Sequence, residues 1–182
     1  MKKLIINTLL LICFVACSDD EECAPESSPY YGTANIIMNG QVLELGAVAG
    51  NASCGTKNLS LRTEFYDENG LRRMSIVIGN FPPYIGKYTL KKAGLECVNN
   101  FIYGSANTLD HDALIERFDI VEEADNNELI ITHYDSVAAR LEGRFSMTLA
   151  VKDMFRVDSI EFPDTLVIEY GTFSTEVLPP RE

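Results

Sequence analysis

The sequence predicts an all-β protein: an antiparallel β-sandwich of about ten short strands, with a closed barrel as the alternative. Two observations predict this class. Apolar and polar residues alternate along most of residues 33–178, most clearly over residues 139–151. Turn signals rich in glycine, asparagine and aspartate, such as Asn39-Gly40, separate the alternating stretches.

Residues 1–16 have the layout of a secretory signal peptide. Two lysines precede an apolar run over residues 4–15, and the small residue Ala16 precedes Cys17. A helix over this run would cover about 18 Å, whereas the hydrocarbon core of a bilayer is about 30 Å thick. We therefore expect the leader to be cleaved rather than to span the membrane.

Val15-Ala16-Cys17 resembles a bacterial lipobox, in which diacylglycerol is attached to the cysteine thiol before the leader is removed. The aliphatic residue usual three positions before the cysteine is Phe14 here, a departure that keeps the apolar character. The resemblance implies a lipoprotein anchored through Cys17, because two or more acyl chains hold a protein stably on a membrane. An ordinary signal peptide with an unmodified cysteine is the alternative.

Residues 17–32 are expected to be a lipidated acidic tether. Four consecutive acidic residues follow Ser18, and such a run stays solvated rather than packing into a core. A serine and several acids after the lipidated cysteine also resemble the export signal of Bacteroidota surface lipoproteins. That resemblance implies an outer-membrane protein exposed at the cell surface, whereas a plain spacer would leave it facing the periplasm.

Residues 33–178 are expected to form a single β domain and residues 179–182 a short tail. A mature chain of this size buries about 70% of its unfolded surface, which is enough for one core. Loss of the two leader lysines changes the formal net charge from −12 to −14. This charge argues against nucleic acid as a partner, because phosphates are bound by basic patches.

Three cysteines remain after leader removal and lipidation, namely Cys23, Cys54 and Cys97. We prefer Cys54–Cys97 as a disulfide because Cys23 lies in the tether, and closing this loop would stabilise the fold by about 4 kcal/mol. Separate thiols are the alternative. The absence of a CxxC motif and the presence of only two histidines argue against a zinc site.

The first expected hairpin is centred on Asn39-Gly40. Apolar residues at 36–38 and 41–45 flank this dipeptide, and both of its residues tolerate the positive φ of a type I′ turn. Residues 46–55 are mostly small, and we expect them to form a loop.

A second hairpin is expected from the alternation over residues 59–65 and its return at residues 74–78. The intervening segment, Asp67-Glu68-Asn69-Gly70, is rich in turn-forming residues. Further strands are expected at residues 86–90 and 101–106.

The period of residues 110–124 is ambiguous, since their apolar positions fit either a helix or a strand. We favour a strand because residues 128–133 look like its hairpin partner. Residues 139–151 have one apolar and one polar face, as expected for a strand of an antiparallel sheet with one solvated side.

The last expected strand contains a change of phase. Leu166, Ile168 and Tyr170 share one face, whereas Phe173 and Val177 resume at odd positions. Gly171 lies at the change, so we expect a β-bulge there that restores the inward face. The complete pattern favours a sandwich over a closed lipocalin-like barrel.

Four motifs in the last hundred residues are similar to those of small uncharacterised Bacteroidota lipoprotein domains. They are Gly86-Lys87-Tyr88-Thr89-Leu90, residues 128–135 (ELIITHYD), residues 141–146 (LEGRFS) and residues 170–173 (YGTF). The motifs mark strands and corners rather than chemistry. The resemblance therefore implies an uncharacterised surface lipoprotein domain and no established activity.

We expect no catalytic, cofactor or metal site. Asp110-His111-Asp112 has metal-binding side chains, but adjacent residues of one loop rarely converge on one ion. His133 shares a face with Leu129 and Ile131, which indicates a core or rim position. Asp135 is not accompanied by a serine-elbow or reactive-cysteine motif.

Glycan binding is the alternative function that we carry forward. Surface lipoproteins of this bacterial type often serve polysaccharide uptake, and β-sandwiches bind sugars through exposed aromatic platforms. The candidate ligand aromatics are Phe81, Tyr84 and Tyr103, and Tyr30 and Tyr31 also lie in expected loops. The opposing interpretation is that these rings pack onto the core, and the absence of tryptophan weakens the glycan hypothesis.

Three segments resemble the acceptor for protein O-glycosylation in Bacteroidota, an aspartate followed by serine or threonine and an apolar residue. They are Asp135-Ser136-Val137, Asp158-Ser159-Ile160 and Asp164-Thr165-Leu166. Aspartate followed by serine is also ordinary turn chemistry. Taken together, the sequence predicts a non-enzymatic surface lipoprotein that binds an unknown ligand or another envelope protein, with an adhesive or assembly role as a further alternative.

Overall fold

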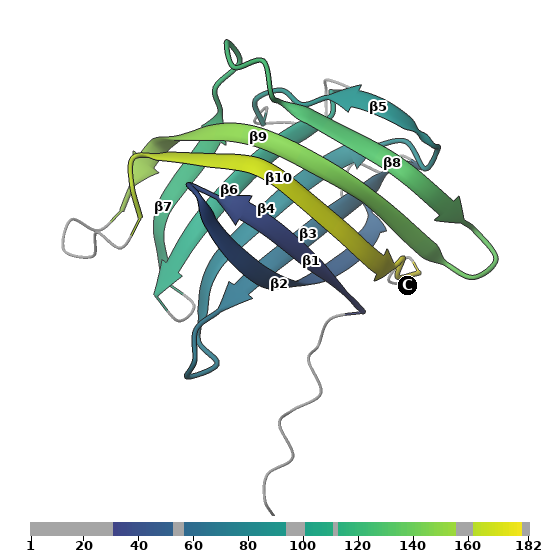
Figure 1. Ribbon diagram of the computed structural model, residues 1–182, viewed down its shortest axis with the longest axis horizontal. Helices are drawn as coiled ribbons and strands as arrows, with labels where there is room; N and C mark the ends of the chain where they lie inside the picture. The colour runs from purple at the N-terminus through teal and green to yellow at the C-terminus, as the bar shows by residue number, and fades with distance from the viewer. Residues whose placement is uncertain (1–30, 53–56, 94–100, 111–112, 156–161, 180–182) are drawn as a thin grey trace, which may run out of the picture.

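The computed structural model describes residues 31–52, 57–93, 101–110, 113–155 and 162–179. Within these ranges the chain forms ten antiparallel strands and no helix (Figure 1). The strands are β1 (Gly32–Met38), β2 (Gln41–Asn51), β3 (Leu59–Tyr66), β4 (Arg72–Phe81), β5 (Gly86–Thr89), β6 (Tyr103–Asp110), β7 (Ala113–Ile120), β8 (Glu128–Asp135), β9 (Arg140–Met154) and β10 (Thr165–Glu176). Over the same ranges, no helix is present that could cross a membrane.

Eight of the strands close into a barrel. They follow the order β1, β2, β3, β4, β6, β7, β9 and β10, and β10 closes the ring by pairing with both β9 and β1. The predicted all-β class and the count of about ten strands are confirmed, and the arrangement is the closed barrel rather than the sandwich. The barrel forms because both edges of β10 are paired, which removes the sheet edges that a sandwich would leave open.

Strand β9 organises the wall because it is long enough to pair with two strands on one side. Its first part pairs with β8 and its last part with β7, while β10 runs along its other side. The predicted strand within residues 110–124 is confirmed as β7. Its predicted hairpin with residues 128–133 is wrong, since β8 pairs with β9 and β5.

The turn between β7 and β8 explains this difference. The Asn127 side chain donates hydrogen bonds to the carbonyls of Val121 and Ala124, at 2.7 and 3.0 Å. Its Oδ1 accepts the amide of Thr148 in β9, at 3.0 Å. The turn is therefore fastened to β9, and the chain continues along β9 instead of returning along β7.

The residues expected as a loop from 46 onward are instead the second half of β2, which continues to Asn51. Ala47 and Ala49 point inward and are buried, and Ala47 pairs with Thr63 of β3. Both alanines belong to the buried core of the barrel. The run of small residues suggested a loop, but the small side chains are there because they pack inside the barrel.

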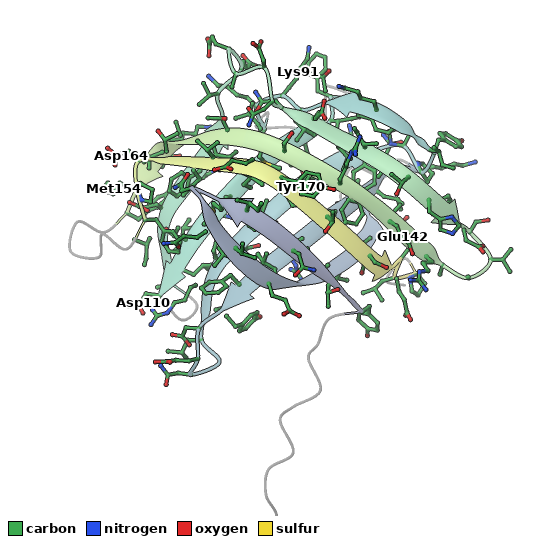
Figure 2. The ribbon with its side chains drawn as sticks, in the orientation of Figure 1. Lys91, Asp110, Glu142, Met154, Asp164 and Tyr170 are labelled. Carbon is green, nitrogen blue, oxygen red and sulfur yellow. The ribbon has the colours of Figure 1, made fainter. Side chains whose placement is uncertain are left out.

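Both predicted backbone irregularities are confirmed. Asn39 and Gly40 have φ angles of 49° and 76°, as a type I′ turn requires. The register of β10 against β9 shifts between Ile168 and Gly171, so that Ile168 and Phe173 both lie inside. Tyr170 lies in the bulge and is 48% exposed (Figure 2).

Two phenylalanines of the barrel interior lie over glycines of the neighbouring strand. Phe145 of β9 faces Gly171 of β10, and Phe173 of β10 faces Gly143 of β9. The two ring centroids are 6.3 Å apart. A Cβ atom at Gly171 would lie 2.9 Å from the Phe145 ring, so the ring occupies the space that a side chain would need. Each ring therefore occupies the place of the side chain that the facing glycine lacks.

The two ends of the barrel differ in what they carry. We call one the tether end, because Gly32 at the start of β1 pairs there with Thr175 near the end of β10. The opposite, hairpin end carries the β1–β2 turn at Asn39-Gly40 and the β3–β4 turn (Figure 1). A tether joined to Gly32 would therefore enter at the end opposite these two turns.

Candidate functional site

A pocket of about 340 Å³ lies on the outside of the barrel wall, where β7 ends beside β9. Three segments of the chain line the pocket. They contribute Lys92 and Ala93, then Asp119, Ile120, Val121 and Glu123, and finally Ala150, Val151 and Lys152. Asp119 points outward, because its neighbours Phe118 and Ile120 are fully buried on the inside.

Each wall of the pocket has a local structural cause. Hydrogen bonds join the amide of Lys91 to the carbonyl of Ile102 and the amide of Gly104 to the carbonyl of Lys91, at 2.9 and 3.2 Å. They hold the segment that carries Lys92 beside the start of β6. On the opposite side, Asp119 pairs with Ala150 across the strands, and the small alanine leaves space on the outer face.

Lys152 reaches the pocket through a bulge in β9. Val151 pairs with Phe118 and Asp153 pairs with Arg117, so Lys152 is the extra residue. Bulges of this kind redirect a side chain. The Lys152 ammonium lies 2.9 Å from Oδ2 of Asp119 and forms an ion pair with it.

Asp119 is the most unusual group of the pocket. Its side chain is only 8% exposed. Oδ2 is paired with Lys152, whereas Oδ1 is buried and accepts no hydrogen bond, with the Arg117 Nε 4.0 Å away. A buried carboxylate oxygen without a donor is costly. A bound group that offers an O–H or N–H would therefore be stabilised here.

The remaining lining residues make the pocket chemically mixed. Lys92 and Lys152 carry positive charge, Asp119 and Glu123 carry negative charge, and Val121 contributes apolar surface. Among the residues that the structure describes, no three histidine, cysteine, aspartate or glutamate side chains gather as metal ligands would. The carboxylates can accept hydrogen bonds from a small polar molecule, and the ammonium groups can donate hydrogen bonds to it.

A second buried carboxylate, that of Glu116, lies inside the barrel. Residues 116, 118 and 120 of β7 share its inward face, and Oε2 of Glu116 accepts a hydrogen bond from the Thr108 hydroxyl at 3.2 Å. The surrounding interior is filled by large buried side chains, including Phe118 and Met74. We assign Glu116 to the packing of the barrel.

The three candidate ligand aromatics do not form one platform. Phe81 is 0% exposed and belongs to the core, so it cannot offer a ring to a ligand. Phe81 is the last residue of β4 and pairs with Leu59 of β3, so the loop begins only at the prolines that follow it. The ring of Tyr103 packs over Gly79 and is half-buried.

Tyr84 remains as an exposed ring, at 69% of its surface. Its carbonyl accepts a hydrogen bond from the Tyr88 hydroxyl at 2.8 Å. Burial raises the pKa of the Tyr88 phenol, and the neighbouring Tyr84 adds to this shift. Tyr31 is half exposed at the tether end, and Tyr30 lies outside the described residues.

Ser136 occupies the exposed tip of the β8–β9 hairpin. Oδ1 of Asp135 accepts the amides of Val137 and Ala138, at 2.8 and 2.9 Å. These backbone hydrogen bonds, that of Ala138 first, lower the pKa of the Asp135 carboxyl. Asp135 thus orders the turn and leaves the Ser136 side chain in solvent.

The other predicted site residues are scattered or lie outside the described ranges. Thr165 is exposed at the start of β10. His133 is exposed on β8 opposite Glu142 of β9 and does not share the buried face of Leu129 and Ile131, because the register shifts between Ile131 and His133. Asp110 forms an ion pair with Arg73, at 3.2 Å. The remaining residues, Cys17, Cys54, Cys97, His111, Asp112 and Ser159, lie outside the described residues.

Comparison of the chain with protein-family models, with curated proteins and with solved structures finds no match.

The sequence analysis did not identify the residues of the pocket. The available signal was the aspartate between two apolar residues in Phe118-Asp119-Ile120. From the alternation alone, such an aspartate is expected to face solvent. In the structure Lys152 and Arg117 lie beside Asp119, and Lys92 lines the same pocket.

Proposed function

We propose that this protein is a non-enzymatic binding protein, anchored to the bacterial outer membrane through lipid on Cys17 and displayed at the cell surface. The leader, the lipobox and the acidic run after Ser18 support the anchoring and the export. Gly32 begins β1 at one end of the barrel, so a tether joined there would leave the pocket on the wall uncovered.

The observation that carries the binding role is the carboxylate of Asp119. It is more than nine-tenths buried and lines a pocket, and its Oδ1 accepts no hydrogen bond within the described structure, with the Arg117 Nε 4.0 Å away as an ion-pair partner. Its ion pair with Lys152 fixes the position of the carboxylate at the pocket. The ligand is a small molecule or the end of a larger one, since the pocket is small.

The anchoring is tested by Cys17→Ala. Wild-type protein should incorporate a labelled fatty acid and remain with the membranes, whereas the variant should lose the label, because the thiol is the attachment point. Cells grown with the labelled fatty acid are fractionated and the protein is immunoprecipitated. Label on the variant would show that Cys17 is not the lipidated residue.

Protease treatment of intact cells then tests surface display. The domain of wild-type protein should be digested while a periplasmic marker survives. Full protection of the domain would place the protein on the inner leaflet and overturn the surface assignment.

The binding role is tested by filling the pocket with Ala150→Phe. Ala150 lies on the outer face opposite Asp119, so the added ring occupies the pocket without entering the barrel. Thermal unfolding is followed with separate additions of neutral glycosides, amino acids, inorganic phosphate and divalent cations. We expect at least one class to raise the Tm of the wild type and not that of the variant, because a ligand stabilises the state that binds it.

Circular dichroism supplies the control, and Ala150→Phe should retain the β-sheet spectrum of the wild type. No stabilisation of the wild type by any class, or equal stabilisation of both proteins, would contradict the proposed site.

A further inference from the structure

We propose that the Asp119 pocket binds one ring of a neutral, polyhydroxylated ligand, either a free monosaccharide or the terminal ring of a glycan. This inference rests on the proposed binding function and names the class of ligand. It is carried by the charge balance, the hydrogen-bonding capacity and the size of the pocket.

The charge balance favours a neutral ligand. The side chains of Lys92 and Lys152 oppose those of Asp119 and Glu123, so the lining itself carries no formal net charge, and Arg117 outside the lining lies 4.0 Å from Asp119 Oδ1. A cation that approached Asp119 would meet the ammonium of Lys152, which already lies 2.9 Å from that carboxylate. An anion would meet the unsatisfied oxygen of Asp119 and the strong negative charge of the whole chain.

The hydrogen-bonding groups favour hydroxyls in particular. Oδ1 of Asp119 needs a donor, whereas the ammonium groups of Lys92 and Lys152 need acceptors. A hydroxyl group is both donor and acceptor, so neighbouring hydroxyls on one ring satisfy the carboxylate and the lysines together. Hydrogen bonds to charged partners are the stronger class, which offsets the loss of water by the ligand.

Size and surface favour a single ring. The volume of about 340 Å³ lies at the small end of the range of about 300–1,000 Å³ for ligand pockets. Ala93, Val121 and Ala150 supply apolar surface beside the charged groups, which suits the C–H face of a sugar ring. A longer glycan would enter with its terminal ring and leave the rest in solvent.

The test uses methyl glycosides of common hexoses and N-acetylhexosamines, followed by saturation-transfer NMR and titration calorimetry on the soluble mature domain and tether with Cys17→Ala. We expect at least one glycoside to bind with a Kd in the millimolar range, as for other small ligands with few contacts. Oligosaccharides that end in the same ring distinguish the two sources. Tighter binding of the oligosaccharide indicates a glycan end, and equal binding indicates the free sugar.

Three variants locate the binding. Asp119→Asn removes the charged acceptor, and we expect it to weaken binding about tenfold. Lys92→Ala changes an exposed residue that the barrel does not need, so its expected loss of affinity cannot be attributed to misfolding. Glu64→Gln is the matched control and should bind like the wild type, because Glu64 is another buried carboxylate, is paired with Arg72 and is not part of the pocket lining.

The outcomes separate this inference from the proposed function. Binding of phosphate or an amino acid, but of no glycoside, with loss in Ala150→Phe would keep the pocket as a binding site and overturn the neutral-sugar assignment. Glycoside binding that persists in both Lys92→Ala and Ala150→Phe would place the sugar elsewhere and overturn the inference. Absence of binding by every probe would overturn both proposals.

Discussion

Replacing Phe145 by alanine should lower the free energy of unfolding by about 3–5 kcal/mol, the usual cost of deleting a large buried aromatic side chain. The Phe145 ring is 2% exposed and covers Gly171 on β10. Because Gly171 has no side chain, the residue paired with Phe145 on β10 cannot fill the space that the ring leaves. The cavity therefore remains, and the cost should lie toward the upper part of this range.

Chemical denaturation of the soluble mature domain measures this loss. Tyr170→Ala is the matched control, since Tyr170 is an aromatic residue beside Gly171 but faces solvent, and its replacement should change the stability by less than about 1 kcal/mol. Equal losses in the two variants would show that the cost comes from the β10 backbone and not from interior packing.

Gly143→Ala should destabilise the barrel by about 1–3 kcal/mol or prevent folding, the range for an overpacked core. A Cβ atom at Gly143 would overlap the carbonyl oxygen of Ile130 on β8 and the ring of Phe173. The Phe173 ring can rotate away or be replaced by a smaller side chain, but the Ile130 carbonyl belongs to the paired backbone of β8 and β9 and cannot move by itself. The strain must therefore move the strands apart.

Gly171→Ala provides the comparison, because the nearest atoms to its added Cβ all belong to the Phe145 ring. Shortening that side chain in Gly171→Ala/Phe145→Leu should recover part of the stability lost through Gly171→Ala. Gly143→Ala/Phe173→Leu should recover little, since the clash with Ile130 remains. Thermodynamic cycles on urea unfolding measure both couplings, and equal rescue at both positions would contradict the role of the backbone contact.

These two predictions concern the same strand that builds the pocket. Phe145 and Gly143 face the interior from the first half of β9, whereas Ala150 and Lys152 line the pocket from its second half. Since alternate residues of a strand face opposite sides, β9 packs the core with one face and positions the pocket with the other. The rigidity of the interior thereby supports the geometry around Asp119.

The local elements of this fold were predictable from the sequence. Asn39-Gly40 predicted the type I′ turn, the clear alternation over residues 139–151 predicted β9, and the phase change at Gly171 predicted the bulge in β10. Each signal lies within a few consecutive residues. It depends on the φ preference of a turn or on which face of a strand is apolar, and both properties are local.

The sequence by itself therefore determined the all-β class, the main strands and most of their inward faces. The leader, the tether and the lipid anchor stay predictions. Only the tertiary structure decided that β10 closes a barrel with β1 and β9, that β8 pairs with β9 rather than β7, and that Ala47 and Ala49 belong to a strand. It also brought Lys92, Asp119 and Lys152 together. The physical reason is that alternation specifies a face but not a partner, since the pairing of distant strands depends on how their side chains pack across the whole interior.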